Sequence, residues 1–140
     1  MSRDPRYDIL FEPVRIGPVT SRNRFYQVPH CNGLGHRDPS GVAAMRGMKA
    51  EGGWGVVSTE MVEIHHGADV NPYVELRIWS GHDVPMLAGI AEAIHKHGSL
   101  AAIELCHSAY TATNSWSRET PIAASAMPVS STFYDQTHAR

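Results

Sequence analysis

The sequence has no apolar run that approaches the roughly 20 residues needed to cross a membrane as a helix. It has no excess of positive charge either, because 12 Lys and Arg residues stand against 14 Asp and Glu residues, a formal net charge of −2. A chain without a basic surface is not expected to bind nucleic acid or an anionic membrane. Cysteine occurs only at Cys31 and Cys106, too few for a disulfide framework. We therefore expect a cytoplasmic protein with reduced thiols.

Common cofactor-binding signatures are also missing. There is no Walker phosphate loop, and Gly33-Leu34-Gly35 lacks the third glycine of a dinucleotide-binding loop. His30-Cys31, His65-His66 and Cys106-His107 offer imidazole and thiolate groups, but no HExxH or CxxC spacing occurs. We expect no metal site, and a non-catalytic ligand- or metal-binding module is the alternative of another class.

What the chain does contain is an alternation of strand-like and helix-like segments. Residues 8–20 are broken by two prolines and a glycine and predict a hairpin or arm. Residues 24–28, 55–61 and 100–105 are rich in apolar and β-branched residues and predict three strands, the second reaching residue 64 in its longest form. Residues 65–81 and the segment after residue 105 are expected to be mostly loop.

Two helices are predicted between these strands. The first spans residues 42–51, with Ser40 as its N-cap and an apolar face made of Ala44, Met45 and Met48. The second follows Asp83, a good N-cap, and ends at Gly98. Its buried stripe has helical spacing and consists of Leu87, Ile90, Ala91 and Ile94.

Strands that alternate with helices favour a parallel sheet, in which functional groups collect at the carboxyl ends of the strands. The first predicted strand leads into Pro29-His30-Cys31, the second ends near Glu60-Met61, and the third ends near Glu104. Because the three ends meet at one edge of the sheet, these side chains are candidates for one site. A doubly wound sheet and a barrel both begin in this way, so the alternation does not separate them.

The residues alone leave several roles open. Cys31 is either a thiol with a lowered pKa that acts as a nucleophile or a small buried side chain at a strand end. Glu104 either accepts hydrogen bonds from a ligand or pairs with an arginine inside the fold. His107 is read as a structural histidine, the His65-His66 pair as solvated, and Met61 as core filler or a pocket residue.

Four long strings then identify a resemblance. The segments DILFEPVRIGPVTSRNRFYQVPHCNG, KAEGGWGVVSTEMVEIHH, HKHGSLAAIEL and NSWSRETP occur in this order. They resemble the opening of the trimethylamine and dimethylamine dehydrogenases, flavoproteins of the old yellow enzyme class. The resemblance runs from about Arg3 to Pro121. It implies the N-terminal part of a (β/α)₈ TIM barrel, with about three βα units preceded by a hairpin.

The resemblance also implies a cofactor and its site. Members of the family carry FMN at the carboxyl face of the barrel, and in the amine dehydrogenases the cysteine of the VPHC string is bonded to carbon 6 of the flavin. That cysteine corresponds to Cys31. Pro29 and His30 match residues against the flavin ring. Glu60 and Met61 match the end of the second strand beside the flavin, and Glu104 matches a residue that hydrogen-bonds its pyrimidine edge.

The implied activity is oxidation or demethylation of an N-methylated amine by hydride transfer to the flavin. The alternative is an NAD(P)H-dependent enoate or 2,4-dienoyl reductase of the same family. Met61 stands where relatives that take trimethylamine have an aromatic residue, which predicts a different substrate. The expected partners are a small amine or enone and an electron acceptor or NAD(P)H.

The length sets the domain organisation, because a complete barrel needs about 200 residues or more. We expect one incomplete domain, with an arm at 1–23, three βα units at 24–121 and a loop or tail at 122–140. The catalytic residues, and the 4Fe-4S cluster of larger relatives, are expected beyond residue 140. A full-length relative is expected to be a homo-oligomer, and this chain alone is expected to be inactive.

Overall fold

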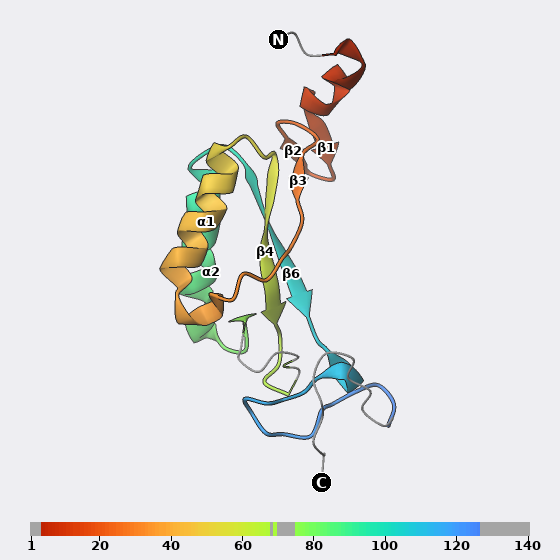
Figure 1. The fold of residues 1–140 in the computed structure, drawn as a ribbon, viewed down its shortest axis with the longest axis vertical. Coiled ribbons are helices and arrows are strands. Elements are labelled where there is room, and N and C mark those ends of the chain that lie inside the picture. The colour runs from red at the N-terminus through yellow and green to blue at the C-terminus, as the bar shows by residue number, and fades with distance from the viewer. Residues whose placement is uncertain (1–3, 68, 70–74, 127–140) are drawn as a thin grey trace.

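The computed structural model describes residues 4–67, 69 and 75–126. The chain begins with a 3₁₀ helix and a two-stranded hairpin, and an α/β region follows (Figure 1). The helices are α1 (Pro39–Glu51) and α2 (Val84–His95). The strands are β1 (Val14–Ile16), β2 (Val19–Ser21), β3 (Tyr26–Gln27), β4 (Val56–Glu63), β5 (Leu76–Arg77) and β6 (Leu100–Cys106). Short 3₁₀ helices span Pro5–Phe11, Gly35–Arg37, Gly81–Asp83 and Ala109–Thr111.

The main sheet is parallel, as the alternation of strands and helices predicts. β4 pairs with β3, with β5 and with β6, and all three pairings are parallel. In register, Val56 lies opposite both Tyr26 and Leu100, so β3, β4 and β6 start at one level. The pairing of β4 with β6 is irregular between Ser58 and Met61. The three predicted strands therefore lie side by side, with the second in the middle.

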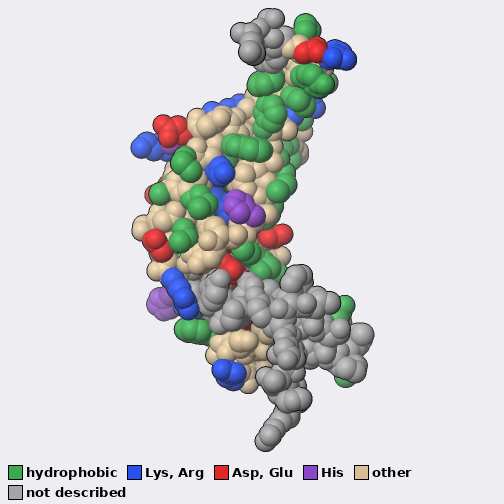
Figure 2. All heavy atoms as spheres, in the orientation of Figure 1, with side chains coloured by type: hydrophobic (Ala, Val, Ile, Leu, Met, Phe, Trp, Pro, Cys, Tyr) green, Lys and Arg blue, Asp and Glu red, His purple; other side chains and the backbone are tan. Residues whose placement is uncertain are grey.

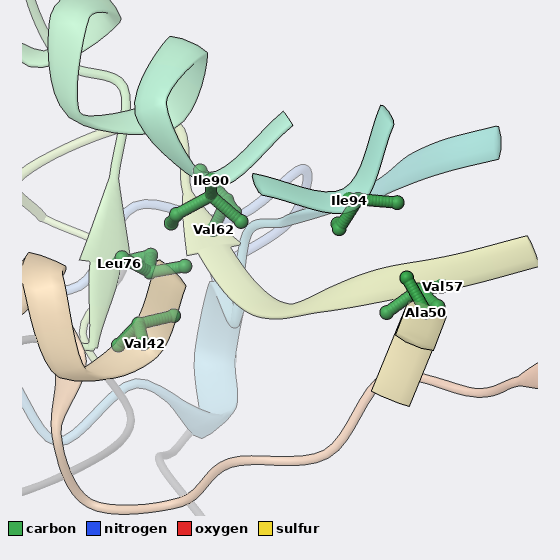
Figure 3. Packing of buried hydrophobic residues seen from close by; sticks show 7 residues of the cluster. All are labelled: Val42, Ala50, Val57, Val62, Leu76, Ile90 and Ile94. Atoms are coloured by element: carbon green, nitrogen blue, oxygen red, sulfur yellow. The ribbon is translucent and has the colours of Figure 1, made fainter. Parts of the chain in front are cut away.

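Both helices pack on one side of the sheet, beside each other (Figure 1). The core between them is apolar, and its seven fully buried members come from α1, α2, β4 and β5 (Figure 3). They are Val42, Ala50, Val57, Val62, Leu76, Ile90 and Ile94. The helices approach closely at Gly47, where an added Cβ would lie 3.3 Å from the carbonyl oxygen of Ala93. A side chain at this position would push the two helices apart.

The predicted boundaries and faces of α1 need correction. The carboxylate of Asp38 accepts a hydrogen bond from the Gly41 N–H at 2.9 Å, so Asp38 caps this helix and Ser40 does not. The buried face carries Val42, Arg46, Gly47 and Ala50, whereas Met48 of the predicted apolar face is 60% exposed. The prediction failed because it assumed that a buried face contains apolar residues only.

α2 follows its predicted stripe, since Ile90 and Ile94 are buried and Leu87 packs against them. Gly98 takes the expected left-handed backbone conformation, with φ of 71°. Asp83 precedes the helix but its carboxylate does not cap it. The carboxylate instead accepts the N–H groups of Trp79 and Ser80 at 3.0 Å and pairs with Arg77 at 2.9 Å.

One predicted loop contains more structure than expected, and the predicted N-terminal hairpin is present. The segment at 65–81 includes β5 and a 3₁₀ helix, while its residues 68 and 70–74 lie outside the described part. The N-terminal arm is a 3₁₀ helix followed by the β1–β2 hairpin, whose register places Val14 opposite Ser21. Exposed hydrophobic side chains gather over this arm (Figure 2). They include Tyr7, Ile9, Phe11, Ile16 and Val19. No helix in the described residues is long and apolar enough to cross a membrane.

Arg22 ties the arm to the ends of both helices. Its guanidinium donates to the carbonyl oxygens of Ala50 and His97, each at 2.7 Å, and to that of Trp54 at 3.2 Å. These carbonyls belong to the last turn of α1 and to the residues just after each helix. A cation at this position also opposes the negative ends of the two helix dipoles.

We predict that Arg22→Met lowers stability by about 2 kcal/mol, because it removes several charge-assisted hydrogen bonds at once. Thermal or urea denaturation of the folded protein measures this loss. Arg15→Met is the matched control, because the hydrogen bond of Arg15 within the described part of the chain is local, to the carbonyl oxygen of Gly17 in the hairpin. Equal stability of the two variants would contradict the bridging role of Arg22.

Candidate functional site

The carboxyl ends of β3, β4 and β6 bring the predicted residues together. Cys31 lies in the loop after β3, and its thiol accepts a hydrogen bond from the backbone of Met61 in β4. Met61 is in turn paired in register with Glu104 of β6. The backbone N–H of Asn32 donates to the carboxylate of Glu60 at 3.1 Å. Three segments that are distant in sequence therefore meet at one edge of the sheet.

The loop that carries Cys31 is held in place by Arg46 of α1. This arginine is fully buried in α1, although the sequence offered no reason to place a charge on the buried face. Its guanidinium donates to the carbonyl oxygen of His30 at 2.7 Å and to the side-chain oxygen of Gln27 at 3.0 Å. The same group faces Nδ1 of His30 at 3.3 Å. Sequence reasoning missed Arg46, and its only signal was that it lies four residues after Val42, on the same helix face.

His30 and Pro29 occupy the start of this loop. The His30 ring also has the side-chain amide of Gln27 at 3.1 Å from Nδ1. Both neighbours of Nδ1 are N–H donors, so this nitrogen acts as a hydrogen-bond acceptor. His30 as a whole is exposed and Pro29 is half-buried.

The surroundings of Cys31 contradict the idea of a thiol with a lowered pKa. Burial of the thiol and the carboxylate of Glu75, with smaller contributions from Glu60 and Glu104, raise the pKa of Cys31 to about 11. The Met61 N–H opposes this shift but is outweighed. The residue as a whole is exposed, so it is not a buried filler at a strand end either. The lowered pKa and the full burial are therefore both wrong for Cys31, and its role as a nucleophile stays a prediction.

Four buried carboxyl side chains lie close to the carboxyl end of β4 and influence one another's ionisation. Glu60 and Glu63 of β4 are fully buried, and so are Asp69 and Glu75 to within 2%. Burial, reinforced by the charges of Asp69 and Glu75, raises the pKa of Glu63 to about 8. Burial and the neighbouring Glu60, which shares a hydrogen bond with it, raise the pKa of Glu75. Glu63 and Glu75 therefore resist ionisation more strongly than solvated carboxyl groups do.

Glu104 differs from these carboxylates because it is exposed. It lies on β6, where its backbone N–H donates to the hydroxyl of Thr59 at 3.3 Å. The arginine partner considered for it does not occur among the described salt bridges. Its carboxylate is thus free to accept hydrogen bonds from a ligand that lies on the strand ends.

The histidines at the ends of β4 and β6 form a second, outer group. The rings of His65 and His66 stack at 4.2 Å, and His66 pairs with Glu119 at 2.6 Å, so this pair is not merely solvated. His107 is exposed and accepts the Ala109 N–H at 3.1 Å, which gives it the structural role expected. Within the described residues, no group of three or more His, Cys, Asp or Glu side chains is arranged to hold a metal.

The loops after β4 and β6 are joined through Asn114. This residue is 1% exposed and adopts a positive φ of 48°. Its amide accepts from the Asp69 N–H at 3.1 Å and donates to the carbonyl oxygens of Gly67 and Glu119. The NSWSRETP string therefore begins with a residue that organises the rim of the site.

Comparison with known proteins places this arrangement among flavoenzymes. Dimethylamine dehydrogenase from Hyphomicrobium sp. (strain x) is 52% identical over 105 residues, which cover 75% of this chain and 14% of that protein. The structure of histamine dehydrogenase from Rhizobium sp. 4-9 superimposes with a TM-score of 0.87 at 53% identity, over 95% of this chain and 20% of the other. The chain thus spans a fifth or less of these relatives.

The wider family matches as well. The old yellow enzyme homologue from Zymomonas mobilis superimposes with a TM-score of 0.70 at 29% identity, over 84% of this chain and 33% of that protein. The parallel sheet with helices on one side is therefore part of a (β/α)₈ barrel, as expected. Residues 9–138 match the sequence pattern of one FMN-dependent family. The chain belongs to the NADH:flavin oxidoreductase / NADH oxidase family.

Proposed function

We propose that this chain forms the start of the catalytic barrel of an FMN-dependent oxidoreductase that oxidises or demethylates an N-methylated amine. The observation that carries the proposal is the meeting of Cys31, Met61 and Glu104 at one sheet edge. Two relatives that are more than 50% identical are an amine dehydrogenase for dimethylamine and one for histamine. The setting is cytoplasmic, and the complete protein is a homo-oligomer.

The residues present suit an isoalloxazine ring. Cys31 and Glu104, both exposed residues, lie on either side of Met61, whose backbone donates a hydrogen bond to the Cys31 thiol. Glu104 would accept a ring N–H, Pro29 and His30 would contact the ring, and Glu60 with Met61 would border it. Cys31 would carry a covalent bond to the flavin. We propose no ligands for a 4Fe-4S cluster among the described residues.

FMN would supply the redox chemistry, by accepting a hydride from the carbon next to the substrate nitrogen. The protein must then bind and orient the amine and exclude competing reactions. The carboxyl groups of Glu60 and Glu104, which act on Cys31 as negative charges at the strand ends, favour an ammonium substrate over an anion. Water that enters afterwards hydrolyses the oxidised substrate and releases the dealkylated amine.

Met61 predicts which amines are accepted. The thioether of methionine lacks the ring quadrupole that attracts a trimethylammonium cation, so trimethylamine should bind weakly. We propose a larger N-methylated amine or amino acid as substrate. Equilibrium binding of trimethylamine to the reduced and oxidised holoenzyme tests this, and binding as tight as in enzymes with an aromatic residue at the Met61 position would contradict it.

The proposal is tested on the complete polypeptide purified with its flavin. After denaturation, we expect the yellow colour to stay with the protein and the peptide that contains Cys31 to carry the mass of FMN. Cys31→Ala should abolish this link, and Cys106→Ala, the matched control, should retain it. We also expect an N-methylated amine to bleach the flavin without NAD(P)H. Release of all flavin on denaturation would exclude the covalent bond, and no bleaching by any amine would exclude the amine activity.

A second candidate is a reductase of activated alkenes that uses NAD(P)H. It is favoured by the likeness to the old yellow enzyme homologue from Zymomonas mobilis. The two candidates differ in the reductant. Bleaching of the flavin by NAD(P)H, followed by reoxidation with an enone, would support the second candidate against the first.

A further inference from the structure

The loop that carries Cys31 is held between two buried side chains of opposite charge. Arg46 and Glu60 are both fully buried, one in α1 and the other in β4. Arg46 donates to the carbonyl oxygen of His30, the residue before Cys31, at 2.7 Å. Glu60 accepts from the backbone N–H of Asn32, the residue after Cys31, at 3.1 Å. The backbone is thus hydrogen-bonded to a buried side chain on each side of the cysteine.

Burying these two charges lowers the stability of the fold, which suggests that they are kept for a function other than stability. An isolated buried charge is destabilising by several kcal/mol, and even a buried pair rarely improves stability over apolar residues of the same size. Arg46 occupies the center of the face where α1 meets the sheet, between the buried residues Val42 and Ala50. One guanidinium nitrogen, Nε, and one Glu60 oxygen, Oε1, lack hydrogen-bond partners of normal geometry among the described residues.

The two charges also act on the thiol electrostatically. Four charged groups face Cys31 from different elements: Arg46 in α1, Glu60 in β4, Glu75 before β5 and Glu104 in β6. Three of them are acidic and oppose formation of a thiolate. Arg46 is the one cation in this described set, and it interacts with both Glu60 and Cys31.

We propose that Arg46 and Glu60 are paired positioning residues for Cys31, which fix its loop from opposite sides and act on its side chain through opposite charges. The proposal rests on the proposed function, because it explains how a thiol that resists ionisation is prepared for attachment to a flavin. A thiolate is the nucleophilic form of cysteine, and the guanidinium lowers the free energy of forming it.

The test uses alkylation of the thiol in flavin-free protein, so that it does not depend on flavin chemistry. The complete polypeptide is expressed under riboflavin limitation and treated with iodoacetamide at pH 9. The thiolate forms a carbon–sulfur bond, iodide leaves, and the thiol proton passes to the buffer. Rates for Cys31 and Cys106 are read separately from the masses of their peptides. Cys106 reports on general unfolding in the same sample.

We expect Arg46→Met to slow alkylation of Cys31 about tenfold relative to Cys106, which corresponds to a rise of one unit in pKa. Arg46→Lys keeps the charge and should stay within about threefold of the unchanged protein. Glu60→Gln removes an opposing charge and should accelerate alkylation by about threefold or more. Lys49→Met, on the same helix, is the control for loss of a positive charge.

A purely structural role makes a different prediction. If the two residues only hold the loop, both replacements loosen it and both accelerate alkylation of Cys31. An Arg46→Met rate equal to or above that of the unchanged protein would therefore overturn the proposal, and so would slower alkylation in Glu60→Gln. The covalent flavin and amine bleaching are measured separately on the flavin-loaded protein, so failure of the proposed function is distinguished from failure of this inference.

Discussion

Glu63→Gln is expected to raise thermal stability at pH 8 and above and to leave it nearly unchanged near pH 4. The side chain of Glu63 is fully buried, and burial together with the charges of Asp69 and Glu75 raises its pKa from 4.5 to about 8. Below pH 4.5 the group is protonated in both the folded and the unfolded chain, so glutamine is a fair substitute. At pH 8 and above, the original protein must ionise a buried carboxyl, and the variant need not.

The sign follows from proton binding. Between the unfolded pKa of 4.5 and the folded pKa of about 8, the folded state holds a proton that the unfolded state has lost. Stability contributed by this proton is fully present below pH 4.5 and is lost as the pH rises towards 8, by at most about 1.4 kcal/mol per pH unit. Glu75 adds a change in the same direction, because its pKa is also raised.

Melting temperatures measured from pH 4 to pH 8.5 test this prediction. The variant should show a shallower decline than the original protein, with the remaining slope due to Glu75. Glu51→Gln is the control, since Glu51 is exposed on α1 and should leave the profile unchanged. Parallel profiles for Glu63→Gln and the original protein would show that the buried carboxyl does not hold its proton.

The 140-residue chain expressed by itself is expected to aggregate and to bind little FMN. Among the described residues β3 and β6 each pair with β4 alone, so both edges of the sheet lack a further strand. The helices cover one face only, and on β6 Ile103 is 46% exposed and Leu105 is 61% exposed. A hollow of about 360 Å³ between α2 and β6 is lined by apolar side chains that include Leu87, Ile94 and Ile103. Exposed apolar strands and unpaired sheet edges promote association with other chains.

Size-exclusion chromatography with light scattering, together with an FMN titration, measures this outcome. We expect species much larger than a 15.4 kDa monomer and no saturable binding at micromolar FMN. Co-expression with the remaining strands of the barrel should restore a discrete species. A monomer that melts cooperatively and binds one FMN would contradict the prediction and would mean that three βα units suffice.

The parts of the site that were predictable from sequence share a local cause. Strand ends in a parallel sheet meet at one edge, so the order of strands in the sequence already predicts that Cys31, Met61 and Glu104 lie together. α2 was predictable for the same reason, because its apolar spacing and Gly98 are local signals. Binding of FMN by these residues stays a prediction, because contacts within the chain bring the side chains together but do not identify the ligand.

The tertiary structure decided what local patterns could not. Arg46 is buried because its partners, Gln27 and His30, come from a segment 16 to 19 residues earlier in the chain. The carboxylate of Asp83 does not cap α2, because it already accepts hydrogen bonds from the Arg77 side chain and from the backbone N–H of Trp79. A lowered pKa for Cys31 was one of two alternatives that the neighbouring histidine left open, and the three carboxylates that folding brings near the thiol raise its pKa instead.

The sequence by itself thus determined the order of the elements, the parallel sheet and the edge at which side chains meet. Only the tertiary structure decided which charges are buried there and how they alter the ionisation of the thiol. The physical reason is range: periodicity and capping depend on residues within a turn or two of each other, whereas burial and electrostatic energy depend on groups that folding brings together from any position.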